Sequence, residues 1–330
     1  MRKRGIAFLL SFPLAICLFT GCQRHSYSET YYLISNNMAL PYWQTAIAGF
    51  TRAGRLYGVK AVTAGPNTFD AQAELQALQN AVQAKPNGIL ISVADPSVLG
   101  PEIDKAIAAG IPVITIDSDA PQSHRLFFIG TNNREAGHLG GQRIVEKLGG
   151  KGNVVFFTMP GQPNLDERLK GYQEIFAEHP GIKTAEVFNI KGDSGNAFDA
   201  TQRLVAQTGA NKIDAFVCLE ASAGKDVGEV LRRQPGKDHL LIAMDVDPDT
   251  LNLIKDGVID TTIAQKPYTM GYVGLKMLDE IFHYPPKPIR TDYKVNTFSP
   301  YPVFVDTGTA AVNKENVDAY LQQASEAVQK

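Results

Sequence analysis

The chain has few cysteines, which form the disulfides of small exported proteins, and few histidines, which serve in many enzyme active sites. It contains three cysteines in 330 residues, and its six histidines are scattered, with His138 and His179 reading as surface or helix residues. It has no Walker loop, nucleophile elbow, dinucleotide fingerprint or metal-ligand cluster. A formal net charge of −2 gives no excess of basic residues for nucleic acid. We therefore expect no cofactor and no metal.

The one long apolar run lies at the start of the chain. It extends over residues 6–19, is interrupted only by small residues and Pro13, and follows Arg2, Lys3 and Arg4. A spanning helix needs roughly 20 apolar residues, so this run is too short to span and has the form of a secretory signal peptide. We expect residues 1–21 to be removed on export, which leaves the mature chain more acidic.

A cysteine directly follows this leader. Thr20-Gly21-Cys22 resembles a bacterial lipoprotein processing site, in which the thiol of the cysteine is acylated, although Phe19 replaces the usual leucine. The alternative is ordinary cleavage near Ala15. With Cys22 acylated, Cys218 would have no partner for an internal disulfide, so stability must come from buried apolar surface.

From residue 31 onward, short aliphatic runs alternate with segments of helical periodicity. This alternation is typical of parallel sheets covered by helices on both faces. Helical spacing of apolar residues is clear at 72–83 and 101–109. The expected strands are 31–35, 59–63, 88–92, 112–116, 127–130, 153–158, 185–190, 215–219, 240–244 and 261–264. Because these exceed one small open sheet, we predict two α/β lobes.

Polar side chains stand directly after several of these strands. Ligands of open parallel sheets bind beyond the carboxyl ends of the strands, so these positions predict a site. The residues concerned are Asn36, Asp117, Glu220, Asp245 and Gln265.

Several motifs, taken in order, resemble the type I periplasmic binding proteins, and most of all their ribose- and galactose-binding branch. The resemblance covers about residues 31–318. Each motif is weak alone, but their order and spacing are specific. The motifs are Leu40-Pro41-Tyr42-Trp43, the run from Gly110 to Asp117, Ile129-Gly130-Thr131-Asn132-Asn133, the run from Glu167 to Tyr172, Met244-Asp245, and Thr262-Ile263-Ala264-Gln265.

This resemblance implies an α/β fold of two doubly wound parallel-sheet lobes, joined by a hinge of three crossovers, that close around a ligand. The N-terminal lobe would comprise residues 29–132 plus 266–305, and the C-terminal lobe residues 133–265 plus 306–330. Residues 22–28 would link the lipid anchor to the first lobe.

The resemblance also implies roles for aromatic residues. Tyr42 and Trp43 stand where the family places two aromatics that sandwich a sugar ring, whose C–H faces pack on a π surface. Trp43 is the one tryptophan of the chain. The alternative is that both rings staple the first helix to the sheet.

Charged residues complete the implied site. Asp117 and Asp245 would each accept hydrogen bonds from adjacent sugar hydroxyls, and Arg168, which matches the family's binding arginine, would donate to the ligand. Either aspartate could also cap a helix.

Further polar positions are implied by the same resemblance. Gln265 matches the family's hinge glutamine, Asn36 is a hydroxyl partner, and Asp193 lies in a loop that often adds a contact or simply turns. Ser118 replaces the arginine of ribose binders, and Glu220 stands where an asparagine is common. We therefore expect a neutral polyhydroxy ligand, or a cationic one, rather than ribose.

The function implied is capture of a neutral sugar or polyol outside the cytoplasmic membrane, with delivery to the permease of an ABC importer by a monomeric, lipid-anchored protein of the periplasm or cell envelope. A receptor for a chemoreceptor or sensor kinase would have the same sequence features. A glycosidase using Asp117, Glu220 and Asp245 is a third reading. A sugar-responsive repressor is excluded, because a leader stands where its basic helix-turn-helix would be.

Overall fold

The computed structural model describes residues 25–234, 238–286, 288–289 and 292–328. The predicted leader and Cys22 lie outside the described residues and stay predictions. Among the described residues, no helix is both long and apolar enough to cross a membrane.

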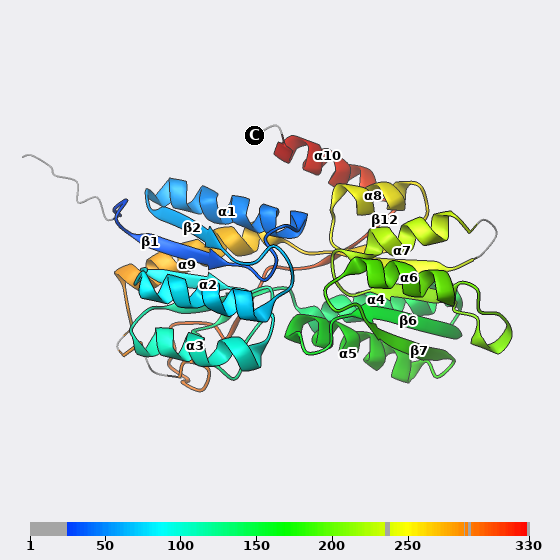
Figure 1. Ribbon diagram of the computed structural model, residues 1–330, viewed down its shortest axis with the longest axis horizontal. Helices are drawn as coiled ribbons and strands as arrows, with labels where there is room; N and C mark the ends of the chain where they lie inside the picture. The colour runs from blue at the N-terminus through cyan, green and yellow to red at the C-terminus, as the bar shows by residue number, and fades with distance from the viewer. Residues whose placement is uncertain (1–24, 235–237, 287, 290–291, 329–330) are drawn as a thin grey trace, which may run out of the picture.

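The chain forms two sheets of six strands each, side by side in two lobes (Figure 1). In the first sheet all strands are parallel, in the order β11-β5-β4-β3-β1-β2. Its strands are β1 (Thr30–Ile34), β2 (Lys60–Ala64), β3 (Gly88–Ile91), β4 (Val113–Ile116), β5 (Phe128–Gly130) and β11 (Phe304–Asp306).

The second sheet has the order β12-β10-β9-β8-β6-β7, and only its edge strand β12 runs antiparallel, paired with β10. Its strands are β6 (Gly152–Thr158), β7 (Ile182–Asn189), β8 (Ala215–Cys218), β9 (Leu240–Met244), β10 (Thr261–Ala264) and β12 (Ala310–Asn313).

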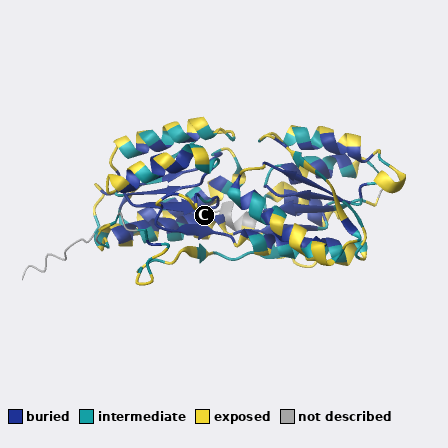
Figure 2. Ribbon diagram, turned by 90° about the horizontal axis from the view of Figure 1, so that it is seen from below, coloured by how far each residue is buried: buried dark blue, intermediate teal, exposed yellow. Residues whose placement is uncertain are grey.

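Helices cover the faces of each sheet, so the central strands are fully buried (Figure 2). The first lobe carries α1 (Pro41–Tyr57), α2 (Ala71–Gln83), α3 (Pro96–Ala108) and α9 (Pro267–His283). The second lobe carries α4 (Asn133–Leu148), α5 (Pro163–Glu178), α6 (Ser194–Leu204), α7 (Ala223–Arg232), α8 (Pro248–Lys255) and α10 (Val317–Val328).

The chain passes between the lobes after β5, after β10 and after β11. This confirms the predicted fold class of two doubly wound lobes with three crossovers. The residue boundaries given for the lobes stay a prediction.

Each predicted strand is present, but two short strands were missed. Of these, β11 is half exposed and short, so it lacks the apolar run that marked the other strands. The helix predicted at 101–109 begins earlier, at Pro96, because the Asp95 side chain accepts a hydrogen bond from the Ser97 amide (2.8 Å) and caps it.

Candidate functional site

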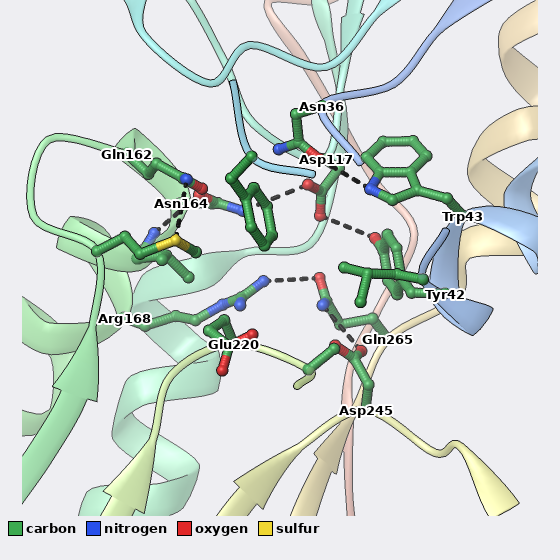
Figure 3. A pocket seen from close by; sticks show the side chains of 15 residues that line it. Asn36, Tyr42, Trp43, Asp117, Gln162, Asn164, Arg168, Glu220, Asp245 and Gln265 are labelled. Atoms are coloured by element: carbon green, nitrogen blue, oxygen red, sulfur yellow. Dashed lines mark hydrogen bonds between the residues drawn. The ribbon is translucent and has the colours of Figure 1, made fainter. Parts of the chain in front are cut away.

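Residues of both lobes line a narrow cavity of about 40 Å³ between the lobes (Figure 3). The lining residues are Asn36, Leu40, Tyr42, Trp43, Phe69, Asp117, Met159, Gln162, Asn164, Leu165, Arg168, Glu220, Ala221, Asp245 and Gln265.

Two aspartates follow equivalent strands of the two sheets with the same unusual backbone. Asp117 follows β4 with φ 62°, and Asp245 follows β9 with φ 69°. The left-handed region is uncommon outside glycine, although Asp and Asn enter it more readily than other residues. The Asp117 amide donates to the Ile129 carbonyl (3.0 Å), and the Asp245 amide donates to the Ile263 carbonyl (2.9 Å). Both bonds connect the aspartate to the neighbouring strand. Such strain clusters at functional sites.

Asp117 joins the two lobes. Its carboxylate accepts hydrogen bonds from the Tyr42 hydroxyl (2.8 Å) and the Ser92 hydroxyl (3.4 Å) of its own lobe. It also accepts one from the Asn164 amide of the second lobe (3.3 Å). The lobes therefore touch directly across the cavity. Burial raises the pKa of Asp117, against the opposing charge of Arg168.

Arg168 projects from α5 into the cavity and is 2% exposed. Its guanidinium donates to Asn133 Oδ1 (2.9 Å), to the Leu219 carbonyl (2.7 Å) and to Gln265 Oε1 (2.9 Å). These acceptors are all neutral. The guanidinium is therefore held in place by the protein itself, while its charge faces the carboxylates of the cavity.

Close packing of α5 against α4 fixes the position of Arg168. A Cβ atom on Gly137 would lie 2.2 Å from the Arg168 carbonyl oxygen, and one on Gly171 would lie 2.3 Å from the Arg134 carbonyl oxygen. No real side chain fits at such distances, so the two helices can approach this closely only because both positions are glycine.

We expect Gly137→Ala to push α5 away from α4 and to lower the free energy of unfolding by about 1–3 kcal/mol. The matched control is Gly100→Ala in α3, where a Cβ meets nothing within 4 Å. That substitution should be neutral or stabilising by about 0.5–1 kcal/mol. Urea unfolding of both variants checks this, and equal effects would contradict the packing argument.

Asp245 is held by Gln265, whose amide nitrogen donates to Asp245 Oδ1 (2.9 Å). The Gln265 oxygen accepts from Arg168 and also from the Thr131 hydroxyl (2.8 Å), at the crossover after β5. Gln265 thus links the arginine, the second aspartate and the hinge. Burial raises the pKa of Asp245 to about 7, although the charge of Arg168 opposes this.

This shift makes stability depend on pH. The folded carboxyl of Asp245 binds its proton more tightly than the unfolded one, so folded stability falls as pH rises from about 4 to about 7. Between pH 5 and pH 7.5, we expect the wild type to lose more stability than Asp245→Asn, by about 2.5 kcal/mol. Asn tolerates the left-handed backbone. Parallel losses in thermal melts of the two proteins would contradict this prediction.

Glu220 lines the cavity, but its carboxylate accepts hydrogen bonds from residues at the start of α7. It accepts from the Ser222 amide and hydroxyl (2.7 Å each) and from the Ala223 amide (2.7 Å). Burial raises the pKa of Glu220 and these bonds oppose it, ahead of the charge of Arg168. Glu220 therefore caps the start of α7.

The aromatic pair does not form a sandwich. The Tyr42 and Trp43 rings meet edge to face, with centroids 5.4 Å apart and planes at 84°, which leaves no space for a sugar between them. Trp43 is buried in the first-lobe core, and its Nε1 donates to Asn36 Oδ1 (2.9 Å). The expected sandwich between these two rings is thus wrong. Both rings instead belong to one wall of the cavity, together with Asn36.

Asp193 is the predicted site residue that the structure does not bring to the cavity. It is exposed, and its carboxylate caps α6 by accepting from the Gly195 amide (2.9 Å). Among the described residues, it stands outside the cavity lining.

Sequence reasoning missed several lining residues. Asn164 stands four positions before Arg168 on α5, so helical spacing could have placed it on the same face. Phe69 lies in the loop after β2 and packs against the second-lobe core, across the cavity. Neither residue directly follows a strand.

Comparisons with known proteins agree with this geometry. Residues 31–283 match the model of the Periplasmic binding protein domain family. The structure of a sugar-binding protein of a sugar ABC transporter from Bacillus halodurans is 34% identical, with a TM-score of 0.75, and the match covers 88% of this chain and 99% of that one. AraP, an arabinose-binding protein from Geobacillus stearothermophilus, is 30% identical with a TM-score of 0.73, over 88% and 99%.

A further relative is more distant in sequence. The xylose/arabinose-binding protein of Sulfolobus acidocaldarius is 27% identical over 78% of this chain, and the match spans 64% of the relative's length. The relatives named here are binding proteins, which confirms the expectation that the chain is not an enzyme. The family match, the two-lobed fold and the 34% identical relative together show that the chain belongs to the type I periplasmic binding proteins, in their ribose-binding-like branch.

Proposed function

We propose that the protein captures a small neutral sugar or polyol in the cavity between its lobes and hands it to an ABC importer. The observation that carries this proposal is the charge arrangement of the cavity. Among the described lining residues, Arg168 is the one basic side chain, and three of its five N–H donors are used by Asn133, Leu219 and Gln265. An anionic ligand would face the carboxylates of Asp117, Glu220 and Asp245 against this single cation.

The carboxylates of Asp117 and Asp245 suit ligand hydroxyls, because an ionised carboxylate accepts several hydrogen bonds. The amides of Asn36 and Asn164 add donors and acceptors, and Phe69 with Tyr42 supplies apolar surface for C–H faces. This mixture fits a polyhydroxy compound.

Related proteins support the sugar class. Relatives are named for arabinose, xylose, ribose and xylitol, all small and neutral. A related structure from Burkholderia graminis holds D-arabinose, with 27% identity and a TM-score of 0.79. Ribose is not our first choice, because Ser118 and Glu220 depart from the ribose-binding pattern.

Ligand capture by such a protein works through closure. We propose that the ligand first contacts the first lobe through Asp117 and the aromatic wall. The second lobe then closes, bringing Arg168, Asp245 and Asn164 to it. Closure is favoured only by contacts that the ligand makes to both lobes. A ligand hydroxyl would replace or join the hydrogen bond between Asn164 and Asp117, which connects the two lobes.

The remaining parts of the proposal concern location and partners. The predicted leader would direct the protein outside the cytoplasmic membrane, to the periplasm or cell envelope. Acylation of Cys22 would anchor it to a membrane by lipid alone, and it would act as a monomer. A sensor protein instead of a permease is the alternative partner, and co-purification from membranes with each candidate separates them.

A thermal-shift panel tests the ligand class. A ligand that binds only the folded protein stabilises it by about 2.7 kcal/mol at a hundred times its Kd. We expect at least one neutral pentose, hexose or polyol to raise the Tm. Matched sugar phosphates and sugar acids should not. A panel in which only the charged compounds shift the Tm would overturn the proposal.

A further inference from the structure

Four metal-ligating side chains meet at the outer end of the first lobe, away from the cavity. His25, Glu29, Asp279 and His283 each offer one ligand atom, and these atoms all lie within 4.8 Å of one another. His25 Nδ1 is 3.3 Å from Asp279 Oδ1, and His283 Nε2 is 3.0 Å from Glu29 Oε2 and 3.7 Å from Asp279 Oδ1. We call this set the His–carboxylate cluster.

Local structure brings the four together. Asp279 and His283 are four positions apart on α9, so they lie on one helix face. His25 and Glu29 flank a turn that leads into β1, in which the Glu29 amide donates to the Ser26 carbonyl (2.8 Å) and the Ser26 amide donates to Glu29 Oε1 (2.8 Å). Because the two halves are 254 positions apart in the chain, sequence spacing could not reveal the cluster.

The cluster contains two buried carboxylates. Glu29 and Asp279 are both buried, with 8% and 4% of their surface exposed. Among the described residues, their ion pairs are with His25 and His283, and no Lys or Arg takes part. Two buried carboxylates thus lie beside two imidazoles, and this set of donors suits a divalent cation.

We propose that the His–carboxylate cluster is a zinc site. Zinc prefers four ligands drawn from imidazole, thiolate and carboxylate, arranged as a tetrahedron. With bonds of about 2.0–2.1 Å, the ligand atoms of such a tetrahedron are about 3.3 Å apart. Three of the six separations, 3.0, 3.3 and 3.7 Å, are close to this spacing, and all six are within 4.8 Å. This proposal departs from the expectation from sequence that no metal binds.

The surroundings fit a structural site. The Tyr31 hydroxyl donates to Asp279 Oδ1 (3.3 Å), and the Tyr57 ring packs on the His25 ring with centroids 5.3 Å apart. Such outer groups orient ligands. Bound zinc would clamp residues 25–29 onto α9, at the amino end of β1, which is the end remote from the cavity (Figure 1).

Metal analysis of the purified protein tests this inference. After removal of metals with a chelator, titration with zinc chloride should give one ion per chain. Equimolar magnesium or calcium should not compete, because these ions prefer oxygen ligands. His283→Gln and Glu29→Gln should each weaken zinc binding by about 100-fold or more, since even outer groups of zinc sites contribute 10–100-fold.

His138→Gln is the matched control. His138 lies beside Glu174 (2.7 Å) and Glu135 (3.5 Å) but has no second histidine. It should bind zinc as the wild type does. Zinc should also slow hydrogen exchange at residues 25–31 and leave sugar affinity unchanged. No bound zinc, or equal loss in His138→Gln and His283→Gln, would overturn the assignment without touching the proposed ligand class.

Discussion

Replacement of Arg168 by methionine is expected to lower sugar affinity at least 100-fold. Methionine leaves Asn133 Oδ1 and the Leu219 carbonyl without their donor, and each buried unpaired acceptor costs about 1–3 kcal/mol. It also leaves Asp117 and Asp245 in a buried cavity without a facing cation. The free energy of unfolding should fall by about 3 kcal/mol or more. Calorimetric titration and urea unfolding measure the two effects.

Two further variants keep this prediction testable if the methionine protein folds poorly. Arg168→Lys retains the positive charge but not the planar set of donors, so its affinity should lie between those of wild type and Arg168→Met. Arg143→Met removes an arginine of α4 that pairs with Asp260 outside the cavity (2.6 Å), and sugar affinity should stay unchanged. Wild-type affinity in folded Arg168→Lys and Arg168→Met would remove Arg168 from the binding mechanism.

Asp117→Asn and Asp245→Asn are each expected to weaken sugar binding by about 10- to 1,000-fold. A hydrogen bond to a charged group contributes about 1.5–3 kcal/mol, and each carboxylate can accept two ligand hydroxyls. Asn keeps the size of the side chain and tolerates the left-handed backbone at both positions. The fold should therefore persist, and calorimetric titration of each variant with the bound sugar gives the loss.

Asp193→Asn is the control for these two variants. It changes an aspartate that is exposed and caps α6 outside the cavity lining, so affinity should not change. A loss in Asp193→Asn as large as that in Asp245→Asn would return the 191–195 loop to the site. An unchanged affinity in Asp245→Asn would remove that carboxylate from ligand contact.

Much of the fold follows from apolar patterning alone. The central strands β3, β4, β8 and β9 are buried almost throughout, and a buried parallel strand must be apolar along its length. By contrast, β11 and β12 pair at sheet edges and are only partly buried, so little in their sequence distinguishes them from loop. These two strands are defined by their pairing with β5 and β10 in the structure.

The site was predictable where a residue follows a central strand. Asp117 and Asp245 stand at the carboxyl ends of β4 and β9, a position that the topology alone directs into the cleft. Phe69 and Asn164 instead reach the cavity from a loop and from a helix. Their directions depend on how the lobes pack across the cavity, and that information is not local in the chain.

Hydrogen bonding decided which polar residues remain available. Glu220 follows β8 in the same way as the two aspartates follow their strands, yet both of its oxygens bind the start of α7. Trp43 likewise gives its indole proton to Asn36. The position of a polar residue after a strand thus predicted that it lies near the cavity. Its hydrogen-bond partners determine whether its side chain is available to a ligand.

Calorimetric titration of the purified protein with D-arabinose, D-xylose, D-ribose and xylitol tests the central proposal most directly. We predict one-to-one binding of at least one of these compounds in the micromolar range or tighter, with a marked loss in Asp245→Asn and none in Asp193→Asn. Tight binding of a sugar phosphate or sugar acid, with no heat from any neutral compound, would contradict it.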